Sequence, residues 1–217
     1  MYKTFTQSKV TAFISTVAAT LLFSGSVFAG PPADGKVRPG KPGPDNIVDT
    51  AVEISKMMND GQGVPEFTYL LGAVGCLDEG DAETILDILT GDDDYTLFAP
   101  VNDAFRALQE ALGVPAEDTA PEVTCAVDGI LGAGTLFAVL QYHVTEGRRF
   151  TNSVFNKNNS KEIEMLAAGS IWSTPDVQLI DGFPQTVTPL IPNVKASNGV
   201  IHAIDTVMLP FNPFVEE

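Results

Sequence analysis

The chain has 217 residues, of which 28 are acidic and 12 are basic, so its formal net charge is −16. This length suffices for one ordinary domain with a sizeable core and some additional segments. The strong acidity argues against binding to nucleic acid or to an anionic membrane surface, because both interactions need a basic patch. We therefore expect an acidic protein whose partners belong to other classes.

Residues 1–29 have the pattern of a secretory signal peptide. Lys3 and Lys9 give a positive start, an apolar run follows, and Val27-Phe28-Ala29 fits a small-x-small cleavage site. The apolar run is short for a membrane span, although an N-terminal anchor helix is the alternative. Cleavage would remove two lysines and take the net charge to −18. No later segment is apolar for long enough to cross a bilayer, so we expect a secreted or periplasmic protein without a transmembrane segment.

Residues 30–45 contain five Pro and four Gly, a composition that cannot bury a core and that predicts an extended tether. Its three basic residues, Lys36, Arg38 and Lys41, are a candidate contact for an acidic polysaccharide, and a solvated spacer is the alternative. We expect the folded domain to occupy residues 46–212, followed by a short tail at residues 213–217.

The apolar spacing predicts a helical half followed by short strands. Helical spacing occurs at residues 46–61, 67–75, 81–91, 102–112 and 136–140. Strand-like runs occur at residues 95–100, 163–166, 170–173, 177–180, 186–188, 190–195 and 197–210. Asp81 and Asn102 are the predicted N-caps of two helices, and Gly91 ends the first of these. Helices first and short strands later predict an α+β fold rather than alternating βαβ units.

The last predicted strand has the sequence SNGVIHAIDTVMLP. Asn198-Gly199 predicts a tight turn, because both residues tolerate a positive φ, and Pro210 ends the strand because it cannot donate to a ladder. Both faces of this strand are mainly apolar, so we expect it to be covered on both sides. His202 and Asp205 would then lie near a core, where each needs a hydrogen-bond partner.

The sequence does not predict an enzyme or a metal site. His143 and His202 are the only histidines. A serine-type site made of Ser197, His202 and Asp205 fails, because on a strand the last two point to opposite faces and the carboxylate cannot orient the imidazole. No nucleophile elbow, zinc-protease, phosphate-loop or dinucleotide motif is present. We therefore predict no catalytic residues.

Cys76 and Cys125 are the only cysteines. An even number of cysteines in an exported protein predicts one disulfide, and two separate buried thiols are the alternative. Two thiols alone cannot form a closed tetrahedral zinc site.

Three segments in register resemble the fasciclin domain. The run YTLFAPVNDAFRAL is similar to its first signature, LQYHVTEGRRF to its Tyr-His segment, and SNGVIHAIDTVMLP to its second signature. The resemblance covers the chain from about Asn46 to Phe211. It implies a β-sandwich or wedge with several short helices packed on one side. It also implies an extracellular setting and a non-enzymatic role in adhesion, with cell-surface or matrix components, polysaccharide included, as partners.

The resemblance also singles out individual residues. Tyr142 and His143 match the segment implicated in integrin recognition by animal members, so they are the interaction candidates. A purely structural His143 is the alternative, and integrin recognition itself does not carry over, because the short acidic motifs of the animal members have no counterpart here. The residues to which the signatures give structural roles are Asn102, Asn198, Gly199, His202 and Asp205.

A second hypothesis for function is the binding of a hydrophobic molecule. Some fasciclin-type proteins of photosynthetic and marine microbes carry carotenoids, and otherwise we expect no cofactor. The apolar residues that could line a slot for such a ligand are Phe67, Leu70, Leu71, Val74, Ile163, Met165, Leu166, Ile171 and Trp172. The loop Ala167-Ala168-Gly169 would let a long ligand approach the backbone. Ordinary core packing is the alternative for all of these side chains.

Overall fold

The structure is a computed structural model that describes residues 45–57, 67–114, 120–132 and 134–213. The predicted signal peptide lies outside the described residues, as do all but one residue of the predicted tether and all but one of the predicted tail. The helices of the first half are α2 (Ile47–Met57), α3 (Thr68–Gly75), α4 (Glu79–Thr90), α5 (Asn102–Ala111), α6 (Ala120–Leu131) and α7 (Thr135–Gln141). A short helix, α8 (Thr151–Val154), follows among the strands.

The eight strands form two four-stranded sheets. The first sheet contains β1 (Tyr95–Pro100), β2 (Val144–Glu146), β7 (Pro189–Ala196) and β8 (Gly199–Ile204) in the order β2-β1-β8-β7. Its β1 and β8 are parallel, and its other pairs are antiparallel. The second sheet contains β3 (Lys161–Glu164), β4 (Ser170–Ser173), β5 (Leu179–Ile180) and β6 (Thr186–Val187), all antiparallel and in chain order. This mixed architecture confirms the predicted α+β class.

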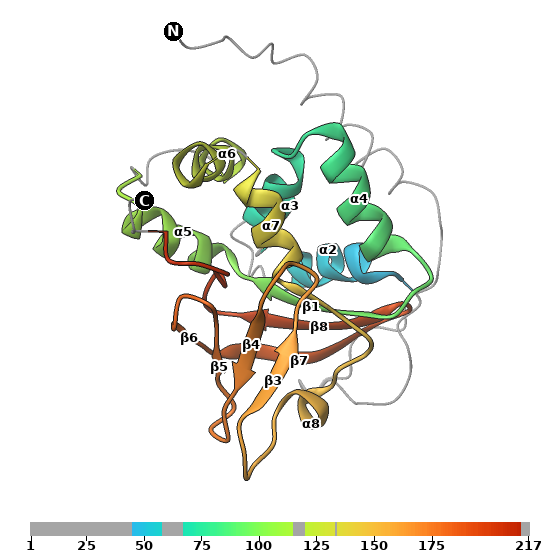
Figure 1. The fold of residues 1–217 in the computed structure, drawn as a ribbon. Helices are drawn as coiled ribbons and strands as arrows, with labels where there is room; N and C mark the ends of the chain where they lie inside the picture. The colour runs from blue at the N-terminus through green and yellow to red at the C-terminus, as the bar shows by residue number, and fades with distance from the viewer. Residues whose placement is uncertain (1–44, 58–66, 115–119, 133, 214–217) are drawn as a thin grey trace, which may run out of the picture. The chain divides into compact units, whose positions relative to one another are not determined.

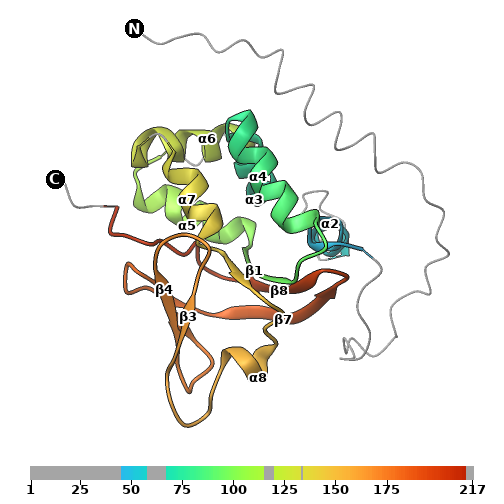
Figure 2. The ribbon, with the colours of Figure 1, turned by 45° about the vertical axis from the view of Figure 1, so that its right-hand side comes forward.

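Within the described residues, the first sheet is the middle one of three layers. The helices α2 to α7 lie on one side of it, and the second sheet lies on the other (Figures 1 and 2). Two hydrophobic clusters fill the two interfaces. The cluster on the helical side includes Leu97 and Ile201, and the cluster between the sheets includes Phe98 and Ile204. Side chains alternate between the two faces of β1 and β8, so odd-numbered residues contribute to the helical-side cluster and even-numbered residues to the cluster between the sheets.

All six residues of β8 are buried, which confirms that this strand is covered on both sides. The strand ends at Ile204, however, six residues before the predicted end at Pro210. Just beyond the strand, Asp205 still contacts the residue before β7: its amide donates to the Thr188 carbonyl at 3.1 Å, and its Oδ1 accepts from the Thr188 amide at 2.8 Å.

The turn before β8 uses different chemistry from the prediction. Ala196 pairs with Gly199, so Ser197 and Asn198 form the turn, and neither Asn198 nor Gly199 has a positive φ. Gly199 is needed for a different reason. A Cβ at this position would lie 2.1 Å from the Tyr95 carbonyl oxygen and 2.6 Å from Cδ1 of Ile47. The glycine therefore lets β1 and α2 approach the start of β8.

Both predicted N-caps are wrong, whereas Gly91 is the C-cap of α4, as predicted. The N-cap of α4 is Asp78, whose Oδ1 accepts from the amide of Asp81 at 3.0 Å. Asn102 does not cap its own helix. Its Oδ1 accepts from the amide of Tyr69 at 3.1 Å, so it satisfies an otherwise unpaired donor in the first turn of α3.

The predicted disulfide between Cys76 and Cys125 is present, with a Cα–Cα distance of 5.2 Å. It joins the C-cap residue of α3 to α6, two helices that pack against each other. Across the described ranges, none of the helices is both long and apolar enough to cross a membrane.

Candidate functional site

Tyr142 follows α7 directly and lies in the interior, with 0% of its surface exposed. Its hydroxyl donates to the carbonyl of Ser170 at 2.7 Å and accepts from the amide of Gly182 at 3.0 Å. Burial raises the pKa of Tyr142 to about 12. The side chain therefore stays neutral and ties α7 to two segments of the second sheet.

His143 is also buried, with 1% exposure. Its Nδ1 lies 2.7 Å from the Val139 carbonyl, and its Nε2 accepts from the amide of Met208 at 3.0 Å. These partners require a neutral ring with its proton on Nδ1. Burial lowers the pKa of His143 to about 4, which agrees with that neutral state. In this position, neither Tyr142 nor His143 can contact a partner directly, so the assignment of these side chains to an interaction surface does not agree with the structure.

His202 has the opposite tautomer. Its Nε2 donates to the Arg149 carbonyl at 2.8 Å, and its Nδ1 accepts from the amide of Asn193 at 3.4 Å. The ring stacks on Phe98 with centroids 5.4 Å apart, and burial lowers its pKa. Its partners differ from those of Asp205, as the prediction of opposite orientations requires. Both histidines of the chain thus bridge backbone groups.

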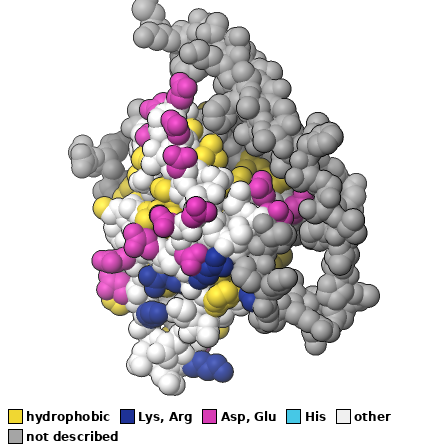
Figure 3. Space-filling model, turned by 90° about the vertical axis from the view of Figure 1, so that its right-hand side faces the viewer, with side chains coloured by type: hydrophobic (Ala, Val, Ile, Leu, Met, Phe, Trp, Pro, Cys, Tyr) yellow, Lys and Arg dark blue, Asp and Glu magenta, His cyan; other side chains and the backbone are white. Residues whose placement is uncertain are grey.

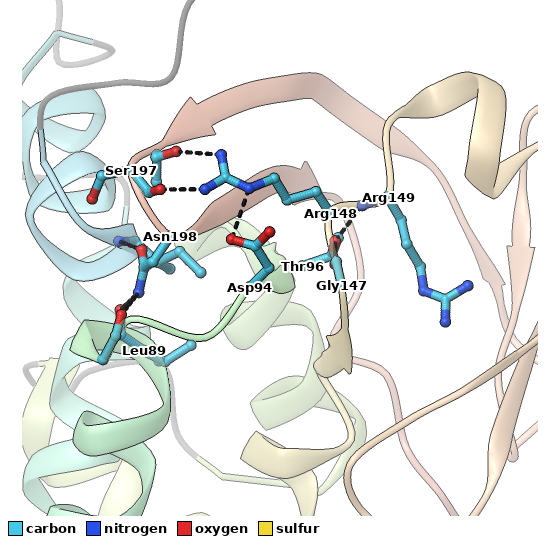
Figure 4. A network of polar contacts seen from close by, with 11 residues as sticks. Leu89, Asp94, Thr96, Gly147, Arg148, Arg149, Ser197 and Asn198 are labelled. Carbon is cyan, nitrogen blue, oxygen red and sulfur yellow. Dashed lines mark hydrogen bonds and ion pairs between the residues drawn. The ribbon is translucent and has the colours of Figure 1, made fainter.

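Asn198 connects three segments at the turn before β8 (Figure 4). Its Oδ1 accepts from the amide of Ile47 at 2.9 Å, and its Nδ2 donates to the carbonyls of Leu89 and Gly91, each at 2.9 Å. The side chain is 4% exposed. It therefore joins the start of α2 and the end of α4 to the β7–β8 turn, which is a structural role.

The two arginines after β2 point in opposite directions (Figure 4). Arg148 forms an ion pair with Asp94 at 2.8 Å and donates to the carbonyls of Ala196 and Ser197. Arg149 is held through its backbone, because its amide donates to Oγ1 of Thr96 at 2.8 Å. Its guanidinium does not take part in the contacts of Arg148.

Arg149 lines a cleft of about 420 Å³ between β2 and the β3–β4 hairpin. Its Nε donates to the carbonyl of Glu146 at 3.1 Å, whereas its two terminal nitrogens have no partner within the described residues. The hairpin side of the cleft contains Ala167, Ala168 and Gly169, whose small side chains leave the space open. Glu146 and Glu164 also line the cleft. The guanidinium in this partly polar cleft suits the binding of a polar or anionic group.

Sequence comparison places the chain in a family. The fasciclin domain profile matches residues 76–210, which is more than half of the chain. The chain belongs to the fasciclin-domain family. Two proteins of Synechocystis sp. strain PCC 6803 are similar to it: protein sll1483, at 31% identity over 68% of this chain and 69% of that protein, and the uncharacterized protein sll1735, at 28% identity over 59% and 82%.

A solved structure of a FAS1 domain pair from the insect cell adhesion molecule fasciclin I also matches, with a TM-score of 0.43 and 15% identity. The match covers 65% of this chain and 45% of that chain, so this chain corresponds to less than half of it.

The fasciclin domain does not bring the nine residues of the predicted apolar slot together. Phe67 and Leu70 belong to the cluster on the helical side of the first sheet, whereas Ile163, Met165 and Ile171 belong to the cluster between the sheets. Of the other members, Val74 and Leu166 pack against the helical-side cluster, and Leu71 and Trp172 are 38% and 47% exposed. The alternative of core packing holds for the buried members. The carotenoid hypothesis therefore has no single slot among the described residues.

Part of the predicted slot does line this cleft of the fasciclin domain: the residues are Met165, Leu166, Ala167, Ala168 and Gly169. The position of Arg149 was not predicted. A signal was present in the composition: residues 147–161 contain four basic side chains and no acidic one, within a chain of net charge −16. In the described part of the chain, no cluster of three or more His, Cys, Asp or Glu residues is arranged to hold a metal ion.

Proposed function

We propose that this protein is a non-enzymatic, exported fasciclin-domain protein that acts in cell adhesion through the cell envelope or the extracellular matrix. The observation that carries the proposal is the family match over residues 76–210, because fasciclin domains are associated with adhesion. The predicted signal peptide supports export, and the Pro/Gly-rich segment behind it suits a tether between the domain and its site of action.

The side-chain chemistry supports a binding role over a catalytic one. General acid–base catalysis needs a titratable group that can reach a substrate, and histidine is its most common source. Here His143 and His202 are 1% and 0% exposed, and backbone groups occupy both nitrogens of each ring. Neither can take a proton from a bound molecule without breaking a hydrogen bond of the core.

The test is the location of the tagged full chain in a bacterial host that exports it. We expect a substantial fraction to remain with the cells and the envelope, and we expect deletion of residues 30–45 to lower that fraction. An exported acidic protein without a fasciclin domain is the control for trapping by charge.

A protein found entirely free in the medium or periplasm, with no partner in a pull-down, would contradict the adhesive role. Visible absorbance of the same purified material, or a spectral change after mixing with carotenoids, would instead favour the hypothesis of a carried hydrophobic molecule.

A further inference from the structure

The basic side chains of this acidic protein are gathered in one region. Residues 147–161 read GRRFTNSVFNKNNSK and contain Arg148, Arg149, Lys157 and Lys161 without any acidic residue. In a space-filling view, the Lys and Arg side chains of this face lie together in its lower half, and most of the Asp and Glu side chains lie above them (Figure 3). The net charge of the whole chain therefore conceals a local positive surface.

Contacts within the fold bring a further lysine to this segment. The amide of Thr151 donates to Oδ1 of Asn193 at 2.7 Å, which attaches α8 to β7. The ammonium group of Lys195 then lies 5.3 Å from the ring centroid of Phe150. Lys161 reaches the same segment from β3, because its Nζ donates to the carbonyl of Ser153. We call Arg149, Lys157, Lys161 and Lys195 the basic surface.

The cations of the basic surface are not neutralised by acidic partners. Within the described part of the chain, ion pairs engage Arg106, through Asp103, and Arg148, through Asp94. No carboxylate lies within ion-pair distance of the basic surface there, and the terminal nitrogens of Arg149 have no partner. These four cations without an ion-pair partner, in a protein of net charge −16, are therefore available to an anionic ligand.

We infer that the basic surface binds an anionic polysaccharide through its carboxylate or sulfate groups. This inference rests on the proposed function and names the partner class for it. The guanidinium fork of Arg149 matches a carboxylate or sulfate in a bidentate arrangement, and the lysines act as point charges. The exposed polar side chains between the cations supply donors and acceptors for sugar hydroxyls; they are Asn152, Asn156, Asn158, Asn159 and Ser160.

The surrounding charge favours a polysaccharide over nucleic acid. Duplex DNA carries one negative charge per roughly 1.7 Å of axis, so a bound duplex would bring many phosphates against the acidic remainder of the protein. Glu146 and Glu164 line the same cleft as Arg149 and would repel either ligand, most of all the one with the denser charge. A polysaccharide with more widely spaced anionic groups can place them on the basic surface alone.

The experiment measures binding of the exported full chain to alginate, a polymer of uronic acids, by isothermal titration calorimetry at low salt. We expect binding that is lost at high salt, because screening weakens contacts between exposed charges. Arg149→Gln and Lys157→Gln should each raise the Kd about 2–5-fold, since exposed ion pairs contribute up to about 1 kcal/mol. The double variant should be weaker still.

Arg106→Gln is the matched control, because it removes one positive charge from α5 while leaving the basic surface intact. Its Kd should equal that of the parent protein, and the emission of the single tryptophan should confirm that every variant is folded.

Three results would overturn the inference: no binding of alginate or dextran sulfate at low salt, equal losses in Arg106→Gln and Arg149→Gln, or tighter binding of duplex DNA or of neutral dextran. If the protein stays with cells but binds no anionic polysaccharide, the proposed function holds and this partner is wrong. If it binds alginate but is never retained by cells, the basic surface binds as inferred and the adhesive role is wrong.

Discussion

At the scale of single residues, four polar side chains of the family signatures form hydrogen bonds with main-chain groups of other segments. Tyr142, His143, Asn198 and His202 are almost fully buried, and each has two or more hydrogen bonds to main-chain groups. A buried polar group without a partner is costly, so each of these side chains and its partners depend on one another. In this structure, the side chains of these four signature residues therefore stabilise the fold and are not placed to contact a partner.

Replacing Asn198 tests this dependence. In Asn198→Ala, the amide of Ile47 and the carbonyls of Leu89 and Gly91 lose their partner inside the protein. We expect the free energy of unfolding to fall by about 2–4 kcal/mol, as measured by urea denaturation. The control is Asn152→Ala at an exposed position, which should change stability by less than about 0.5 kcal/mol. Similar losses in both variants would show that Asn198 is not a structural connection.

His143 should make the fold sensitive to acid. Its folded pKa is lowered to about 4, while the unfolded value is the ordinary 6.5. As the pH falls below 6.5, the unfolded chain takes up a proton before the folded protein does, so stability is lost between pH 6.5 and pH 4. This group alone should lower the free energy of unfolding by about 2 kcal/mol between pH 7 and pH 5.

The variant His143→Gln should be less stable than the parent at pH 7 but should lose less stability on going to pH 5. Urea denaturation at the two pH values measures both. The variant should still lose some stability as the pH falls, because the pKa of His202 is also lowered by burial. If the variant and the parent lost the same free energy of unfolding between pH 7 and pH 5, His143 would not be the group that takes up a proton on unfolding.

The sequence predicted the orientation of these residues better than their partners. The period of a strand predicts that His202 and Asp205 point apart, and their separate hydrogen bonds agree. The partners of Asn198, however, lie 107 to 151 residues away along the chain, and Tyr69 lies 33 residues from Asn102. Local propensity makes an Asn before a helix a cap of that helix, whereas tertiary packing offered Asn102 a donor on a neighbouring one.

At the scale of secondary-structure elements, the approach of β8 to β1 and α2 depends on a missing side chain. A Cβ at Gly199 would overlap the Tyr95 carbonyl and Ile47, and main-chain atoms cannot move as a flexible side chain does. Gly199→Ala should therefore lower stability by about 3 kcal/mol or prevent folding, measured by thermal denaturation. Gly129→Ala in α6 is the control: apart from its chain neighbours and its own helix backbone, no described atom lies within 4 Å of the new Cβ, and the variant should gain about 0.5–1 kcal/mol. Parallel losses in both would contradict the explanation by close approach.

The disulfide acts at the same scale, because it restricts α6 relative to α3. It closes a loop with a sequence separation of 49 residues. The double variant Cys76→Ser/Cys125→Ser should lose about 3–4 kcal/mol in the chain-entropy account. Reduction of the parent protein should give the same loss, since Cys125 is exposed, and reductant should leave the double variant unchanged. A loss on reduction that also occurs in the double variant would point to another cause.

No helix was predicted between residues 112 and 136, where α6 lies. The sequence of α6, APEVTCAVDGIL, contains a Pro in its first turn and a Gly near its end, although Val123, Val127, Ile130 and Leu131 have helical spacing. Elements with a strong period, such as α5 and β1, were predicted within a residue or two. Pro and Gly are typical of loops and turns, so in this segment they outweighed the helical spacing of the apolar residues.

At the scale of the whole molecule, the described residues form three layers that share the first sheet, and this explains why the predicted apolar slot is divided. Apolar spacing predicts which side chains are buried, as it did for Phe67 and Ile163. It does not predict which face of a central sheet each one meets, because that depends on topology. The order of the elements was enough to predict the α+β class. The separation of the two clusters depends on the position of β8 between them, which the order does not reveal.

The charge of the whole chain gives the last prediction. A net charge of −16 repels itself at neutral pH, and the range of that repulsion falls from about 30 Å at 0.01 M salt to about 3 Å at 1 M. Sodium chloride should therefore raise the urea midpoint of unfolding at pH 7 and have little effect near pH 4.3, the isoelectric point. An equal rise at both pH values would show that salt acts through surface hydration instead of charge. The same ions should weaken alginate binding, because that contact is attractive. Salt should thus stabilise the fold and weaken alginate binding. The two measurements together distinguish an effect of the net charge from an effect of the basic surface.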